Sequence, residues 1–289
     1  MDGVSFAVGR GEIFGILGPN GAGKTTTLET IEGLQFPTSG STQVLGLDSR
    51  LDAAEVKQRI GVQLQASAYF DFLTLREILN LFGGFYRRSL APEELLARVG
   101  LEDKAGALVK HLSGGQQQRF SIVASMVNDP EILFLDEPTT GLDPQSRRSL
   151  WDLIRRIRDE GKTIIITTHY MEEAQSLCDR VAIMNGGRIV ALDSPDRLIA
   201  ALEAPFRLRL QTSSPIDTAT LSIPGVDLVS VNEGEDMMDY RLQMANVNST
   251  LPALMAGLAE ANVQLVDLLV EKATLEDVFL ALTGRELSD

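Results

Sequence analysis

The chain has 289 residues, of which 44% are hydrophobic, so it can bury one large core or one large and one small core. Its 26 basic and 40 acidic residues give a formal net charge of −14, which argues against a nucleic-acid partner or a polybasic membrane anchor. The single cysteine, Cys178, excludes an internal disulfide. Because no apolar run reaches roughly 18 residues and no signal peptide is recognisable, the sequence predicts a soluble, cytoplasmic protein.

Apolar segments with strand character alternate with helical patterns over residues 1–205. The predicted strands include Glu12–Leu17, Glu131–Leu135, Thr163–Thr167 and Arg180–Met184. This alternation is typical of an α/β domain with a mixed, largely parallel sheet. From about residue 71 to 127 the apolar period is helical, with Leu75, Ile78, Leu79 and Phe82 on one face, which indicates a helical insertion beside the sheet.

The composition changes after Pro205. Residues 206–289 hold 5 basic and 13 acidic side chains, a net charge of −8, and we expect them to form a separate accessory domain. The predicted elements are strands at 206–210, 226–231, 239–243 and 263–270 and helices that begin at Ser249 and Thr274. This order indicates a small α+β domain.

A glycine-rich segment lies between the first predicted strand and a predicted helix over Thr25–Glu32. It fits the pattern G-x-x-x-x-G-K-[ST] and comprises Gly18, Pro19, Asn20, Gly21, Ala22, Gly23, Lys24, Thr25 and Thr26. In such a loop, backbone N–H groups and the helix N-terminus face phosphate oxygens. We expect Lys24 to reach the β- and γ-phosphates and the Thr25 hydroxyl to bind Mg²⁺. The segment therefore predicts a nucleotide site of the P-loop type.

Two carboxylates follow the apolar strand that ends at Leu135. In an open parallel sheet, ligands collect at the carboxyl ends of strands, where Asp136 is placed to hold Mg²⁺ and Glu137 to act as general base. His169 follows the strand Thr163–Thr167 at the same edge. Its position favours contact with the γ-phosphate or the attacking water, although a lone histidine is more often structural.

A second glycine-containing motif, Leu112-Ser113-Gly114-Gly115-Gln116, lies 23 residues before Asp136. Ser113 and the glycine amides at a helix N-terminus can grip a γ-phosphate. The same residues can also be an ordinary serine N-cap. Together with the phosphate loop, Gln65, Gly141-Leu142-Asp143-Pro144 and His169, this motif resembles the nucleotide-binding domain of ABC-type ATPases over residues 3 to about 200.

The resemblance implies that two such chains, expected as a homodimer, sandwich two ATP molecules. Each phosphate loop would face Ser113, Gly114, Gly115 and Gln116 of the other copy, with Asp143 at the shared interface. It also implies that Gln65 touches the metal or the water. A separate integral membrane permease would dock near the helical insertion, so that the chain is peripheral on the inner face of the cell membrane.

Three further segments resemble the ATP-binding subunits of multidrug or antibiotic-resistance exporters of the daunorubicin-resistance type: 34–40, 168–174 and 275–285. Members of the family usually carry a strand with an aromatic residue that stacks on adenine, well ahead of the phosphate loop. This chain begins with Met1–Phe6, inside the second strand of that region. Either the start of the chain is truncated or adenine is held differently, and the loss of base stacking would weaken ATP binding by on the order of 1 to 3 kcal/mol.

Two alternatives to an exporter ATPase stay open at this point. One is a soluble ABC ATPase that acts on a ribosome or DNA, although such proteins usually carry two fused ATPase halves, a long coiled coil or basic surfaces. The other is a nucleotide-dependent regulatory module that signals through its acidic tail. The intact Glu137 favours turnover of ATP over pure signalling.

Overall fold

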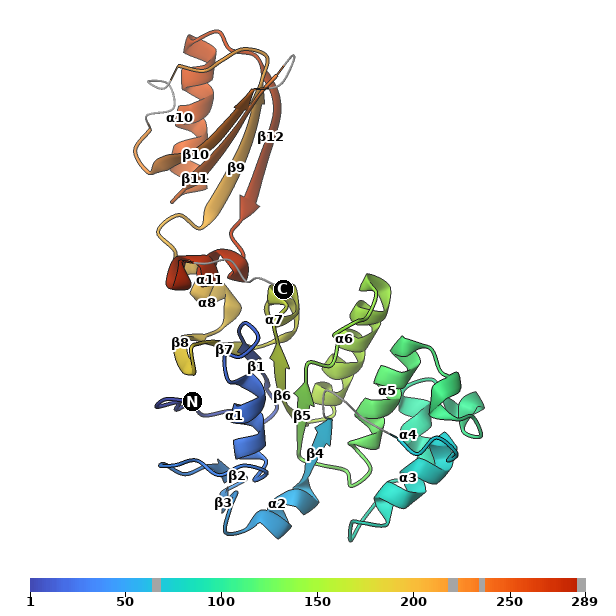
Figure 1. Ribbon diagram of the computed structural model, residues 1–289. Coiled ribbons are helices and arrows are strands. Elements are labelled where there is room, and N and C mark those ends of the chain that lie inside the picture. Colours follow the sequence, from blue (N-terminus) through green and yellow to red (C-terminus); the bar gives the residue numbers. More distant parts are fainter. Residues whose placement is uncertain (64–68, 218–222, 234–236, 285–289) are drawn as a thin grey trace. The chain divides into compact units, whose positions relative to one another are not determined.

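A computed structural model describes residues 1–63, 69–217, 223–233 and 237–284. Its contacts divide the chain into two compact units, of which the first runs from Met1 to Pro195 and the second begins at Asp196 (Figure 1). No helix among the described residues is long and apolar enough to span a membrane.

A six-stranded mixed sheet forms the centre of the first unit. Its order is β4-β5-β6-β1-β7-β8, in which all neighbours are parallel except β7 and β8. The strands are β1 (Ile13–Leu17), β4 (Ile60–Gln63), β5 (Ile132–Asp136), β6 (Thr163–Thr168), β7 (Arg180–Asn185) and β8 (Arg188–Asp193). The predicted α/β fold with a largely parallel sheet is confirmed.

Burial explains why these segments read as near-continuous apolar runs. All five residues of β1 and all six of β6 are buried, as expected for parallel strands covered on both faces. Phe14, Phe134 and Ile165 meet in one core cluster, and Phe6 stacks on Phe14 with ring centroids 5.1 Å apart. The strand expected over Met1–Phe6 is wrong. Residues 1–12 form no strand and contain glycines at positive φ, Gly3 and Gly11.

The helices of the first unit connect these strands (Figure 1). They are α1 (Lys24–Ile31), α2 (Ala53–Arg59), α3 (Leu75–Gly83), α4 (Pro92–Arg98), α5 (Gly114–Ala124), α6 (Pro144–Asp159) and α7 (Met171–Leu177). A two-stranded ribbon of β2 (Gln43–Val44) and β3 (Leu47–Asp48) lies between α1 and α2 in the chain. Between β4 and β5, the described residues hold α3, α4, α5 and two short 3₁₀ turns. A capping box of Thr74 and Glu77 begins α3, where the sequence turns helical.

The second unit begins in the first turn of α8 (Pro195–Ala200) and contains an antiparallel sheet in the order β10-β11-β9-β12. The strands are β9 (Phe206–Thr212), β10 (Val226–Glu233), β11 (Met238–Met244) and β12 (Leu265–Lys272). Helix α10 (Val247–Glu260) packs Leu254 and Leu258 into the core formed with β9 and β11, and α11 (Leu275–Thr283) follows β12. The predicted α+β class of this tail is confirmed.

Candidate nucleotide-binding site

The carboxyl ends of three neighbouring strands, β5, β6 and β1, define the candidate site. Because these strands are parallel, the residues that follow them gather at one edge of the sheet. Backbone hydrogen bonds continue past the strand ends, from Gly18 N–H to the Thr168 carbonyl at 3.3 Å and from Glu137 N–H to the Thr167 carbonyl at 3.2 Å. The phosphate loop, both acidic residues and His169 therefore share this edge.

The phosphate loop adopts a conformation that needs its glycines. Gly21 and Gly23 have φ values of 79° and 100°, in the left-handed region that favours glycine. A β-carbon at Gly18 would lie 2.4 Å from the carbonyl oxygen of Met184. Helix α1 starts directly after the loop, and no side chain caps its N-terminus. Its first N–H groups are thus available to an anionic ligand.

A buried ion pair crosses the site. Lys24 Nζ lies 3.1 Å from Glu137 Oε1, and the two side chains are only 5% and 8% exposed. The ammonium also donates to the carbonyl oxygen of Gly18 at 2.9 Å, which fixes it over the loop. A buried carboxylate and ammonium need such pairing because each is costly to desolvate alone. A polyphosphate that binds the loop would compete with Glu137 for the same ammonium.

Beside this pair, two oxygen-bearing side chains face each other. Thr25 Oγ1 donates to Asp136 Oδ2 at 3.1 Å, and Asp136 is 5% exposed. The described residues contain no group of three or more His, Cys, Asp or Glu side chains arranged for a metal ion. Mg²⁺ nevertheless fits this pair, because it prefers hard oxygen ligands and is commonly held by one or two protein groups together with substrate phosphates. Thr25 and Asp136 are the described side chains that would hold it.

Thr167, at the end of β6, links the two acidic residues and was not singled out from the sequence. Its buried hydroxyl accepts a hydrogen bond from Glu137 N–H at 3.0 Å and donates one to Asp136 Oδ1. Glu137 itself has a φ of 47°, a left-handed conformation that is strained for a glutamate. The Glu137 N–H donates to both the carbonyl and the hydroxyl of Thr167, and these bonds help to hold this conformation.

His169 contacts the predicted general base. Its Nδ1 lies 3.2 Å from Glu137 Oε2, and the hydroxyl of Thr140 donates to the same oxygen at 3.3 Å. The His169 ring also lies against Tyr170, with centroids 4.1 Å apart. The structure thus brings Lys24, Glu137 and His169 into one chain of contacts. Gln65, predicted to touch the metal or the water, lies outside the described residues.

The second glycine motif lies apart from this cluster. Ser113 caps α5 in a capping box with Gln116, and Ser113 and Gly114 are exposed. Among the described residues, no hydrogen bond or ion pair joins Ser113–Gln116 to the phosphate loop. Within the described part of the chain, the motif acts as a helix cap.

Asp143 begins α6 next to that motif. Its carboxylate accepts hydrogen bonds from the backbone N–H of Gln145 and of Ser146 at 3.0 Å and from the Ser146 hydroxyl at 2.5 Å. These bonds lower the pKa of the Asp143 carboxyl, and the bond from the Ser146 hydroxyl has the largest effect. The Ser146 hydroxyl would lie 3.0 Å from a β-carbon at Gly115, so the two helix starts are in contact. Asp143 and the glycine motif thus form one exposed surface.

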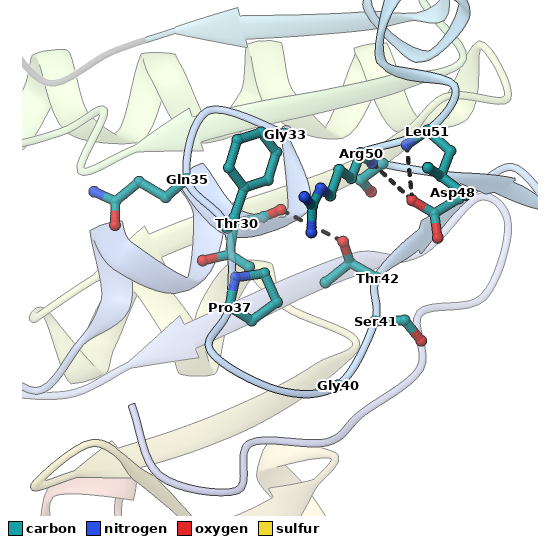
Figure 2. A pocket seen from close by; sticks show the side chains of 12 residues that line it. Thr30, Gly33, Gln35, Pro37, Gly40, Ser41, Thr42, Asp48, Arg50 and Leu51 are labelled. Atoms are coloured by element: carbon teal, nitrogen blue, oxygen red, sulfur yellow. Dashed lines mark hydrogen bonds between the residues drawn. The ribbon is translucent and has the colours of Figure 1, made fainter.

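A small pocket of about 260 Å³ lies where the chain leaves α1 (Figure 2). Arg50 covers the ring of Phe36, with 5.1 Å between the guanidinium carbon and the ring centroid, and Asp48 accepts hydrogen bonds from the N–H groups of Arg50 and Leu51. None of the residues predicted to bind nucleotide lines this pocket. We therefore place the candidate site at the sheet edge.

Comparison with known proteins agrees with this geometry. Residues 1–140 match a family model described as ABC transporter. Nod factor export ATP-binding protein I of Paraburkholderia xenovorans (strain LB400) is 39% identical over 296 residues, which cover 100% of this chain and 93% of that protein. This chain belongs to the family of ABC transporter ATP-binding proteins. The protein of the same name from Rhizobium meliloti is 40% identical, over 100% of this chain and 85% of its own length.

Solved structures support the same fold for this ABC ATP-binding protein. cbiO1 from Clostridium perfringens, part of the ABC transporter complex cbiONQ, matches with a TM-score of 0.62 and 30% identity over 69% of this chain and 83% of that chain. A dimeric ATP-binding cassette in a post-hydrolysis state, bound to ADP and Pi, matches with a TM-score of 0.59 and 28% identity over 66% and 88%. The predicted identity as an ABC-type ATPase subunit of a transporter is confirmed, whereas the daunorubicin-resistance subtype stays a prediction.

Replacing Glu137 by Gln tests its role as general base. The Glu137→Gln variant keeps the shape of the side chain but cannot accept a proton, so we expect ATP hydrolysis to fall at least about 100-fold while ATP still binds. Phosphate release and equilibrium binding of a fluorescent ATP analogue measure the two effects. A variant that retains most of its phosphate-release rate would exclude Glu137 as the base.

Thr167→Val tests the hydroxyl that positions both acids. The loss of its two hydrogen bonds should lower kcat about 10-fold, the equivalent of roughly 1.4 kcal/mol, with a smaller effect on ATP affinity. Thr163→Val is a matched control, because Thr163 lies at the other end of β6, where its hydroxyl accepts a hydrogen bond from Gly11 N–H at 2.9 Å. Equal kcat values for the two variants would contradict a positioning role for Thr167.

Proposed function

We propose that this ABC ATP-binding subunit powers the export of drugs, antibiotics or other lipophilic compounds through a separate membrane permease. Export is supported by relatives that are named for Nod factor export and match the whole chain. The drug-like cargo is supported by the resemblance of segments 34–40, 168–174 and 275–285 to resistance exporters. In this proposal the chain is cytoplasmic, lies peripherally on the inner face of the membrane and has no nucleic-acid partner.

The single observation that carries the proposed chemistry is the contact chain Lys24–Glu137–His169 at the sheet edge. When the γ-phosphate of ATP takes the Lys24 ammonium, the Glu137 carboxylate is released from its ion pair and can accept a proton from the attacking water. His169, within hydrogen-bonding distance of Glu137, keeps that carboxylate directed toward the phosphate. Mg²⁺, held by Thr25 and Asp136 and, in our proposal, Gln65, would neutralise charge on the phosphates.

A second copy of the chain would complete the site. Ser113, Gly114 and Asp143 are exposed and make no hydrogen bond to the phosphate loop among the described residues. An exposed N–H array at a helix start is suited to a phosphate of another molecule. A similar cassette bound to ADP and Pi is dimeric, which supports a dimer of this chain. We therefore propose an ATP-dependent homodimer in which the phosphate loop of each copy faces the partner copy's Ser113.

The permease would dock at an aromatic cavity beside the helical segment. This cavity has a volume of about 680 Å³ and lies between the end of α1, β4, α3 and α5. Its lining includes Leu34, Gln63, Tyr69, Phe82, Phe85 and Tyr86. Leu34 and Phe85 are 50% and 69% exposed, and a gathering of exposed apolar side chains at a cavity is typical of an interaction surface. Because β4 also borders the nucleotide edge, a permease docked here would respond to whether nucleotide is bound.

Ser113→Arg tests the homodimer. The larger, charged side chain should block closure without removing ATP from the phosphate loop, so the variant should bind ATP as the wild-type chain does but elute as a monomer. Size-exclusion chromatography with light scattering in ATP and Mg²⁺, in the Glu137→Gln background to prevent turnover, measures the result. An unchanged ATP-dependent dimer would contradict the sandwich arrangement.

Co-purification tests the transport partner. We expect the tagged chain, expressed with its genomic neighbours, to retain a membrane protein with about six spanning segments, each of roughly 20 apolar residues. Detergent extraction, affinity purification and mass spectrometry identify what is retained. Recovery of ribosomal proteins in place of a permease would favour the soluble ABC ATPase alternative.

A further inference from the structure

Glu32 is a buried carboxyl group that the proposed ATP chemistry does not use. It is 3% exposed, and its Oε2 has no hydrogen-bond partner among the described residues. Leaving a buried polar atom unpaired costs free energy, and the cost is larger for a charged group. We therefore expect Glu32 to serve an interaction with a partner and not the stability of the isolated chain.

The surroundings of Glu32 add to this cost. Glu32 is the residue that ends α1, where the helix dipole disfavours a negative charge, and no basic residue lies in the last turn. Burial raises the pKa of Glu32 to about 7, and the negative charges of Asp136 and Glu29 contribute to the rise. All of these effects disfavour the charged form of Glu32. A cation beside it would compensate that charge.

Glu32 lines the aromatic cavity, so a cation can reach it from outside the chain. The cavity also presents Tyr69, Phe85 and Tyr86, whose rings are suited to the flat face of a guanidinium. Lys57 lines the cavity too, but its side chain is exposed and no ion pair joins it to Glu32 within the described part of the chain. The cavity thus combines an acidic group with an apolar, aromatic wall.

We propose that Glu32 receives a cationic side chain, arginine or lysine, from a segment of the membrane permease whose apolar residues cover Leu34 and Phe85. The inference rests on the proposed transport function and names the chemistry by which the permease is recognised. Helix α1 connects this contact to the nucleotide, because it begins at Lys24 and ends directly before Glu32. The eight-residue helix spans about 12 Å, so that a force on Glu32 is transmitted to the phosphate loop through one rigid element.

The first experiment measures the affinity of the chain for the detergent-purified permease that co-purifies with it. We expect Glu32→Gln to weaken binding at least 10-fold, because the amide keeps the shape but loses the charge. Glu102→Gln is the matched control, since Glu102 is exposed and does not line the cavity. Replacing the recognising arginine or lysine of the permease by glutamine should give the same loss, and the double variant should bind no worse than either single variant.

The second experiment needs no permease. For the isolated chain at pH 8, where the Glu32 carboxyl is charged, Glu32→Gln should raise Tm by about 2 °C or more, because it removes an uncompensated buried charge. If Glu32 had a stabilising partner within the chain, the substitution would lower Tm. A lower Tm for Glu32→Gln would overturn the inference, since it would reveal a stabilising partner within the chain.

The outcomes separate this inference from the proposed function. If the wild-type chain retains a permease and Glu32→Gln binds it equally well, recognition through Glu32 is wrong and the transport function stands. If the wild-type chain retains no permease, the proposed function fails and the inference fails with it. Weaker binding together with a higher Tm supports both.

Discussion

The nucleotide-binding edge depends on the ion pair between Lys24 and Glu137. Both side chains are almost fully buried, and the pair joins the loop after β1 to the end of β5. Two buried charges are tolerated because each compensates the other, and the loss of one would remove the opposite charge that compensates the other. In the proposed chemistry, a phosphate group would take the Lys24 ammonium and release Glu137 to act as the base. The Lys24–Glu137 ion pair would thus link nucleotide binding to ATP hydrolysis.

The rest of the first unit places groups around this pair. The parallel register of β5, β6 and β1 brings Asp136, Thr167 and the phosphate loop to one edge. At the opposite end of α1, Glu32 reaches the aromatic cavity. The loop that grips the nucleotide and the residue proposed to meet the permease are therefore the two ends of one helix. In the proposed function, this helix would connect the permease contact to the site of ATP hydrolysis.

Much of this arrangement could be predicted from the sequence, because the strongest patterns reflect strict local constraints. The phosphate loop is recognisable since Gly21 and Gly23 occupy left-handed conformations and Gly18 lies against the Met184 carbonyl, and β1, β5 and β6 are recognisable since both of their faces are buried. Thr167 could not be singled out, because a threonine is an ordinary strand residue and its role depends on two acids from another strand. The strand over Met1–Phe6 was wrong, because a strand needs a pairing partner that local pattern does not reveal. Glu32 gave no signal, since an acidic residue near a helix end is normally exposed.

The most direct test of the account is a crystal structure of the wild-type chain with Mg²⁺ and a non-hydrolysable ATP analogue. The account predicts that Lys24 Nζ leaves Glu137 for the β- and γ-phosphates, while the Thr25 hydroxyl and Asp136 lie beside the metal. The released Glu137 carboxylate, still next to His169, should face a water in line with the γ-phosphate. A nucleotide bound with the Lys24–Glu137 ion pair intact at 3.1 Å would contradict the account.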